Sequence, residues 1–179
     1  YGREVQRGII PRAVEQVLSQ SQVLEGQNWS YRMYASFMEI YNEQLRDLLA
    51  SMEGAHVSYA PDQGSTKQAG LPGGKLDIKR NASGQSFVSN LTRVEIDVKD
   101  RAVGNRQLDE LMNIAEGARS VASTSMNETS SRSHSVFQLH LEGSNSELGT
   151  ELQGVLNLCD LAGSERLARS NADKDATRL

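Results

Sequence analysis

The stretch VLNLCDLAGSE, residues 155–165, decides the fold class of this chain. Its first half is a nearly continuous apolar run, which is typical of a β-strand buried on both faces of a sheet. Asp160 closes the run and Gly163 follows in the next turn. A carboxylate at the carboxyl end of a strand can hold a magnesium ion or its water. A glycine there lets a backbone N–H approach a phosphate. An ordinary polar turn after a strand fits Asp-x-x-Gly equally well, so this motif alone leaves both interpretations open.

A second polar motif, NETSSRSH at residues 127–134, precedes the alternating stretch VFQLHL. In it, Ser130, Ser131 and Ser133 flank Arg132. Hydroxyls are modest magnesium ligands and good partners for phosphate oxygens, and an arginine pairs with phosphate or carboxylate. Taken alone, the motif also fits a solvated serine-rich loop. Together the two motifs indicate phosphate chemistry.

Helical spacing predicts three helices. The first begins near Pro11, whose missing N–H is harmless in the first turn. A short second helix is predicted after Asn42 as its N-cap, and a third from Arg106. Their apolar faces would consist of Val14, Val17, Leu18, Leu45, Leu48, Leu49, Leu108, Leu111, Met112 and Ala115.

Period-two alternation predicts strands between these helices. The clearest is WSYRMYASFMEIY, where Trp29, Met33 and Phe37 share one side. SNSELGTELQG, residues 144–154, reads as a hairpin connection. Strands are expected at residues 29–41, 75–80, 86–91, 93–98, 136–141 and 155–161. Strands and helices that intermix in this way favour an α/β or α+β fold with a central sheet.

Residues 51–75 differ in composition, being rich in glycine and proline with few large apolar side chains. Such a segment cannot bury enough surface to offset its ordering entropy, so a flexible insertion within the domain is predicted. Strand-like patterns resume after it, which argues against a domain boundary.

The composition suits one globular domain. The chain has 179 residues, 37% hydrophobic and 23% charged, and a formal net charge of −4. That charge excludes a global basic field for nucleic acid or acidic lipid. The single cysteine, Cys159, lies in the apolar run and is expected to be a small buried core residue. No signal peptide or membrane-length apolar run is present, and no histidine has metal-ligand spacing, which together indicate a soluble intracellular protein without a zinc site.

Four motifs together resemble the kinesin motor domain, and they occur in the family's order. NETSSRSH matches the kinesin switch I pattern at every fixed position, and DLAGSE matches switch II. SFMEIYNEQLRDLL resembles the kinesin strand–helix signature, and QRGIIPRAVEQVL the segment just beyond the phosphate-binding helix. VLNLCDLAGSERLARS and VASTSMNE resemble the C-terminal-motor kinesins that move to microtubule minus ends. The resemblance implies a P-loop NTPase-like α/β fold, with a central mostly β sheet flanked by helices.

The resemblance also assigns a nucleotide site that holds ATP and Mg²⁺. It implies that Ser131 helps coordinate the magnesium ion and that Asp160 holds a magnesium-bound water. Ser130 would meet the γ-phosphate, Gly163 would sense it through its N–H, and Asn127 would shape the switch I loop.

The resemblance further implies a catalytic ion pair and a microtubule face. Arg132 and Glu165 would close over the nucleotide and position the attacking water. Because tubulin is acidic, local basic residues should face it. Lys79 and Arg80 in DIKR fall where kinesins present a microtubule-contacting loop, and Arg93 is a weaker candidate. A solvated pair of surface charges is the alternative for these cations.

The chain departs from the family because it contains no Gly-x-x-x-x-Gly-Lys-Ser/Thr loop. We therefore expect residues 1–179 to be a partial motor domain, incomplete at both ends. The parent protein would be a microtubule-based motor ATPase, and these residues alone would not be active. The alternative is a non-catalytic kinesin-like module that binds microtubules or a partner motor. A GTPase-like switch is disfavoured because Asn-Lys-x-Asp is absent.

For the parent, the resemblance implies partners and a place in the cell. Microtubules are the expected partner, with dimerisation through coiled-coil segments outside this chain. Nucleic-acid binding and membrane insertion are not expected. The cytoplasm and the microtubule cytoskeleton, including the spindle, are the implied locations.

Overall fold

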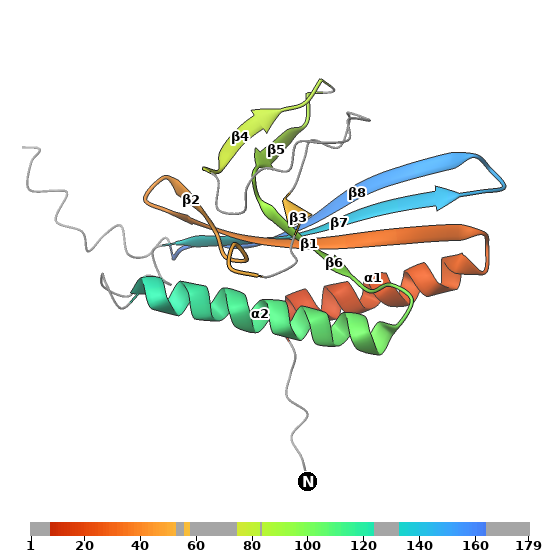
Figure 1. The fold of residues 1–179 in the computed structure, drawn as a ribbon, viewed down its shortest axis with the longest axis horizontal. Coiled ribbons are helices and arrows are strands. Elements are labelled where there is room, and N and C mark those ends of the chain that lie inside the picture. The colour runs from red at the N-terminus through yellow and green to blue at the C-terminus, as the bar shows by residue number, and fades with distance from the viewer. Residues whose placement is uncertain (1–7, 53–55, 58–74, 83, 124–132, 164–179) are drawn as a thin grey trace, which may run out of the picture.

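The protein is described by a computed structural model that covers residues 8–52, 56–57, 75–82, 84–123 and 133–163. Its centre is a six-stranded sheet, with helices α1 (Ile9–Glu25) and α2 (Arg101–Ser123) packed on one face (Figure 1). A separate two-stranded hairpin lies on the other side of the sheet (Figure 1). The predicted α/β class with a central sheet is confirmed.

The sheet runs in the order β3-β6-β1-β7-β8, and β2 also pairs with β1. All described strand pairs are antiparallel. The separate hairpin consists of β4 and β5. The strands are β1 (Trp29–Tyr41), β2 (Gln44–Asp47), β3 (His56–Val57), β4 (Asp77–Arg80), β5 (Ser86–Ser89), β6 (Thr92–Ile96), β7 (His134–Asn145) and β8 (Thr150–Asp160).

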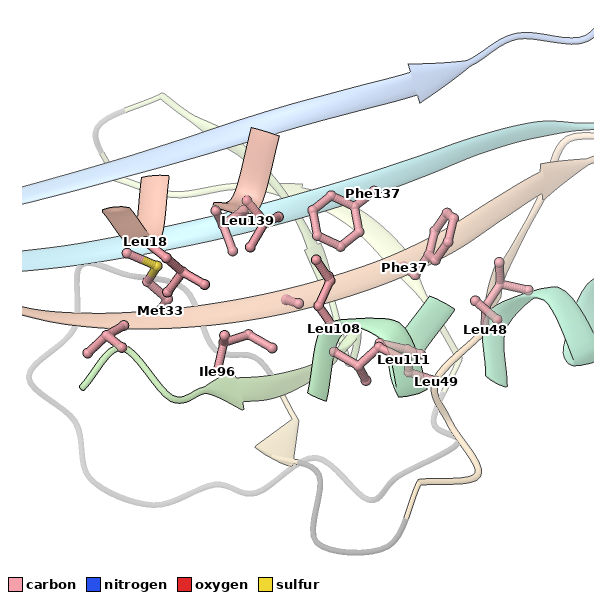
Figure 2. Close-up of a cluster of buried hydrophobic side chains, with 14 residues drawn as sticks. Leu18, Met33, Phe37, Leu48, Leu49, Ile96, Leu108, Leu111, Phe137 and Leu139 are labelled. Carbon is pink, nitrogen blue, oxygen red and sulfur yellow. The ribbon is translucent and has the colours of Figure 1, made fainter. Parts of the chain in front are cut away.

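The core lies between the helices and the inner face of β1, β6 and β7 (Figure 2). Val14 and Leu18 of α1 are fully buried, as the helical spacing predicted. Phe37 of β1 and Phe137 of β7 meet edge to face, with ring centroids 5.9 Å apart. Buried and partly exposed residues alternate along β7 around Phe137, which places one face of that strand against the helices. Along β1, residues 35–39 are all buried.

The short helix predicted after Asn42 is wrong, because this segment forms the hairpin of β1 and β2. Tyr41 pairs with Gln44, which leaves Asn42 and Glu43 as a two-residue turn. Both have positive φ, 49° and 60°. This is the conformation that matches the twist of a tight hairpin, and asparagine tolerates it well. The apolar Leu48 and Leu49 are buried after the hairpin rather than along a helix.

The second helix begins earlier than predicted, at Arg101 rather than Arg106. The Oδ1 atom of Asp100 accepts hydrogen bonds from the N–H groups of Ala102, at 2.9 Å, and Val103, at 3.2 Å. These bonds satisfy free donors of the first turn, so Asp100 acts as the N-cap. The sequence-based boundary missed this aspartate.

The prediction that β8 is buried on both faces is also wrong for the described residues. β8 pairs with β7 alone there and forms one end of the sheet. Cys159 is exposed rather than buried, and Leu152 and Val155 are each 51% exposed. An edge strand of this composition presents unpaired backbone groups beside apolar side chains. The hairpin connection between β7 and β8 is confirmed, with residues 146–149 forming its turn.

Most of the insertion predicted at residues 51–75 lies outside the described residues, so it stays a prediction. Neither described helix combines the length and apolarity that a bilayer crossing requires.

Candidate functional site

The described parts of the two polar motifs meet at the end of the sheet where β7 begins and β8 ends. β7 begins at His134, the last residue of NETSSRSH, and β8 ends at Asp160, the aspartate of DLAGSE. Ser135 pairs directly with Asp160 in the register of these strands. The N–H of Ala162 donates a hydrogen bond to Nδ1 of His134 at 3.1 Å. The end of the first motif and the Asp-x-x-Gly of the second are therefore neighbours.

Of the predicted nucleotide-site residues, the structure describes two. Asp160 is exposed at the end of β8, and Gly163 follows it, partly buried. The other predicted residues lie outside the described ones: Asn127, Ser130, Ser131, Arg132 and Glu165.

The donor chemistry at this edge suits magnesium. Mg²⁺ prefers oxygen ligands and binds through one or two carboxylates together with phosphates and waters. Asp160 supplies an exposed carboxylate beside the start of β7. Within the described ranges, no group of three or more histidine, cysteine or acidic side chains forms a protein-only metal cage. Asp160 is the described residue that would hold the ion or its water, where Mg²⁺ would neutralise phosphate charge.

A buried carboxylate stands next to this edge, and sequence reasoning missed it. Glu39 of β1 is fully buried. Its Oε1 accepts a hydrogen bond from Oγ of Ser133 at 2.7 Å, and its Oε2 accepts one from Arg46 Nη1 at 3.1 Å. Arg119 of α2 places Nε 3.7 Å from Oε1. The buried charge is thus compensated by two cations and a hydroxyl.

A sequence signal for Glu39 was available. The alternation of β1 puts Met33 and Phe37 on its apolar side, and position 39 falls on the same side. Charged residues are rarely fully buried unless they are paired. A glutamate on the apolar face of a strand therefore indicates a buried ion pair.

The predicted microtubule-contacting cations differ in exposure and in the strand on which they lie. Lys79 and Arg80 are exposed on β4, and they are successive residues, so their side chains point to opposite faces of the hairpin. Arg93 is partly buried on β6. Its Nε is buried without a hydrogen-bond partner among the described residues, and burial lowers its pKa while Glu142 acts against that shift.

Arg93 lines a cavity of about 360 Å³ between the β4–β5 hairpin and the sheet. His140 of β7 lines it too, on the face opposite to the buried Leu139. Burial, followed by the charge of Arg93, lowers the pKa of His140 to about 4. Asp160 and Gly163 do not line this cavity, so it is separate from the phosphate-site candidate.

The low pKa of His140 predicts a loss of stability in mild acid. The folded protein keeps His140 neutral down to about pH 4, whereas an unfolded imidazole takes up a proton below about pH 6.5. The unfolded chain therefore binds more protons between these values, and stability falls as the pH drops from 6.5 towards 4. From pH 7.5 to pH 5 the His140 contribution should fall by about 2 kcal/mol. Urea unfolding of wild type and His140→Gln at both pH values checks this, and equal pH dependence in the two proteins would contradict it.

The comparisons with known proteins agree with this geometry. The family model described as the kinesin motor domain matches residues 1–178. Kinesin-like protein KIN-14D of Arabidopsis thaliana is 43% identical over 170 residues, which cover 95% of this chain and 20% of that protein. Carboxy-terminal kinesin 2 of Xenopus laevis is 38% identical over 168 residues, covering 94% and 23%.

Solved structures give the same result for the fold. The C-terminal motor domain of Kar3 from Candida glabrata aligns with a TM-score of 0.64 and 33% identity, over 92% of this chain and 43% of that one. A fast kinesin aligns with a TM-score of 0.69 and 30% identity, over 97% and 40%.

An antiparallel sheet with helices on one face, and with the described parts of two phosphate-type motifs at one end of it, has the arrangement expected of a nucleotide-switch class of fold. Within that class, the chain belongs to the kinesin motor domain family, and its similarity to C-terminal kinesins confirms that part of the prediction. Members of this family bind ATP with Mg²⁺ and associate with microtubules. The chain spans about a fifth of the length of the curated relatives it matches.

Proposed function

We propose that the protein carrying this chain is a microtubule motor that couples ATP hydrolysis to movement. The observation that carries the proposal is the meeting of the two motifs, where Ser135 pairs with Asp160 and His134 accepts a hydrogen bond from Ala162. Phosphoryl transfer depends on placement and charge compensation more than on covalent help. Two segments that converge on one phosphate can also rearrange when it leaves, which links hydrolysis to motion.

The proposed nucleotide site combines residues from both motifs. Ser131 and Asp160 would hold Mg²⁺ or its water, and Ser130 with the Gly163 N–H would meet the γ-phosphate. Asn127 would help shape the switch I loop. When bound, ATP would supply the phosphoryl group and Mg²⁺ would neutralise part of the phosphate charge. The contribution of the chain is to orient the phosphates with hydroxyl and backbone N–H groups.

The catalytic roles fall to Arg132 and Glu165 in this proposal. Their ion pair would close the site and place the attacking water in line with the γ-phosphate. Support for these roles comes from the family motifs NETSSRSH and DLAGSE, which contain both residues.

The test is ATP hydrolysis by the full-length parent protein, measured with and without microtubules. A motor should show turnover that rises at least about tenfold with microtubules, as expected when partner binding speeds a slow step. Microtubule binding without turnover would favour the non-catalytic kinesin-like module instead. Reading the parent gene for Gly-x-x-x-x-Gly-Lys-Ser/Thr provides an independent check.

We propose that the exposed cations of β4 contact the microtubule. Charge reversal of Lys79 and Arg80 together should weaken microtubule binding by several-fold, and more so at low salt, where screening is weakest. Because the two side chains point to opposite faces, one single reversal should reproduce most of the effect. Co-sedimentation over a salt series measures this.

The matched control is reversal of Lys99, an exposed cation near the start of α2. If the Lys79→Glu/Arg80→Glu protein co-sediments like wild type, the β4 patch does not contact the microtubule. Arg93 is the weaker candidate, since part of its side chain is buried beside Glu142.

We further propose that the parent works in the cytoplasm on the microtubule cytoskeleton, including the spindle. Dimerisation through coiled-coil segments would follow the pattern of C-terminal kinesins. A solved Kar3Vik1 protein described as fused to a synthetic heterodimeric coiled coil motivates this expectation.

A further inference from the structure

We propose that Glu39 is a positioning residue for the nucleotide edge of the sheet, where it fixes Ser133 and thereby the start of β7. The inference rests on the proposed function, because it assigns Glu39 a part in placing that site. Four observations carry it: the burial of Glu39, the division of its two oxygens, the register of the sheet, and the contact of His134 with Ala162.

The first observation is that the Glu39 side chain is shielded from solvent. It is fully buried, yet carboxylates are costly to bury unless partners replace their hydration. Arg46 provides one partner from the neighbouring strand, since Glu39 and Arg46 are directly opposite in the β1–β2 register. A sheet that needed only to be stable could fill this position with an apolar side chain.

The second observation is that the two carboxylate oxygens of Glu39 accept hydrogen bonds from two different residues. Oε2 accepts the hydrogen bond from Arg46 within the hairpin, while Oε1 accepts the short one from Ser133. Ser133 is itself 2% exposed, so its hydroxyl bond is shielded from water. Hydrogen bonds to a charged acceptor are about twice as strong as neutral ones. Oε1 therefore holds a residue of the NETSSRSH motif firmly against β1.

The third observation is that Glu39 lies in one cross-strand row with the candidate magnesium ligand. Glu39 pairs with Ser135, and Ser135 pairs with Asp160. Directly opposite residues in antiparallel strands project from the same face, so the row runs from Glu39 through Ser135 to Asp160. Ser135 is also buried, so the row is packed as far as β7.

The fourth observation extends this row towards Gly163. His134 follows Ser133, and its Nδ1 accepts the N–H of Ala162, the residue before Gly163. A displacement of Ser133 would therefore also displace Asp160 and the N–H of Gly163. Small misplacements of groups that orient a reacting phosphate have large effects on rate.

Ser133→Ala tests the proposal in the full-length parent protein. Microtubule-stimulated kcat should fall about tenfold, a change of about 1.4 kcal/mol. The microtubule concentration for half-maximal rate should stay within about twofold, because no binding face is altered. Rates are expressed per molecule that retains fluorescent ADP, so that misfolded protein does not count. Ser133→Thr, which keeps the hydroxyl, should restore most of the rate.

Ser144→Ala is the matched control. Ser144 lies on the same strand and its hydroxyl also forms a hydrogen bond, to Ser30 Oγ at 2.8 Å, but at the far end of β7. The kcat of Ser144→Ala should equal that of wild type. A second check combines Ser133→Ala with Glu39→Gln. Since both changes act on one contact, the double variant should be little slower than the slower single variant.

Three results would overturn the proposal: a Ser133→Ala rate within twofold of wild type, a Ser133→Thr rate as low as that of Ser133→Ala, or full additivity in the double variant. These results differ from failure of the proposed function. A wild-type parent without ATP turnover would overturn the motor assignment and this inference together, whereas an active wild type with an unaffected Ser133→Ala overturns this inference alone.

Discussion

Glu165→Ala in the full-length parent is expected to abolish microtubule-stimulated ATP turnover, with a loss of about a hundredfold or more. Nucleotide binding should remain close to that of wild type. The reason is that Glu165, paired with Arg132, is proposed to act only on the attacking water, an interaction made chiefly in the transition state. Steady-state phosphate release and equilibrium binding of a fluorescent nucleotide measure the two quantities separately.

Glu151→Ala is the control for this variant. Glu151 is an exposed glutamate on β8, near the opposite end of that strand from Asp160. It should leave turnover unchanged. Normal turnover in Glu165→Ala would remove the proposed role of the ion pair. Equal losses of turnover and nucleotide affinity would show instead that Glu165 supports the binding of ATP.

Phe137→Ala is expected to destabilise the fold by about 3–5 kcal/mol. Phe137 is 1% exposed and packs edge to face on Phe37, so its removal leaves a cavity between β1, β7 and the helices (Figure 2). The surrounding helices and strands can relax only partly into that space. Urea unfolding followed by circular dichroism measures the loss.

The matched comparison is Leu148→Ala in the turn between β7 and β8, where the side chain is 70% exposed. It should change the free energy of unfolding by less than about 0.5 kcal/mol. A Phe137→Ala protein as stable as Leu148→Ala would mean that the core drawn between β1 and β7 does not carry the fold.

Periodicity predicted the parts of the fold that local patterns decide. The alternation of residues 29–41 predicted β1 to the residue, and the spacing of Val14 and Leu18 predicted the buried face of α1. The meeting of His134 with the DLAGSE segment followed from two motifs that use the same chemistry. Such signals are local in sequence, and tertiary packing reinforces them.

The sequence-based errors arose where tertiary context decides. Leucines at positions 45, 48 and 49 fit a helix, but the positive φ of Asn42 and Glu43 turned the chain back into a hairpin. The apolar composition of β8 indicated burial, which depends on what packs beside the strand and not on the strand itself. Glu39 was overlooked because its partners, Arg46, Arg119 and Ser133, come from three separate segments of the chain.

The two-residue turn at Asn42–Glu43 has a consequence for the length of that loop. It sets the pairing of Glu39 with Arg46, and side chains alternate faces along a strand. Inserting or deleting a single residue there would move the Arg46 guanidinium to the other face of the sheet. The buried Glu39 carboxylate would then lack that partner. Relatives that keep an acidic residue at the position of Glu39 should therefore have a loop of the same length. Relatives with a loop of another length should lack the acidic residue.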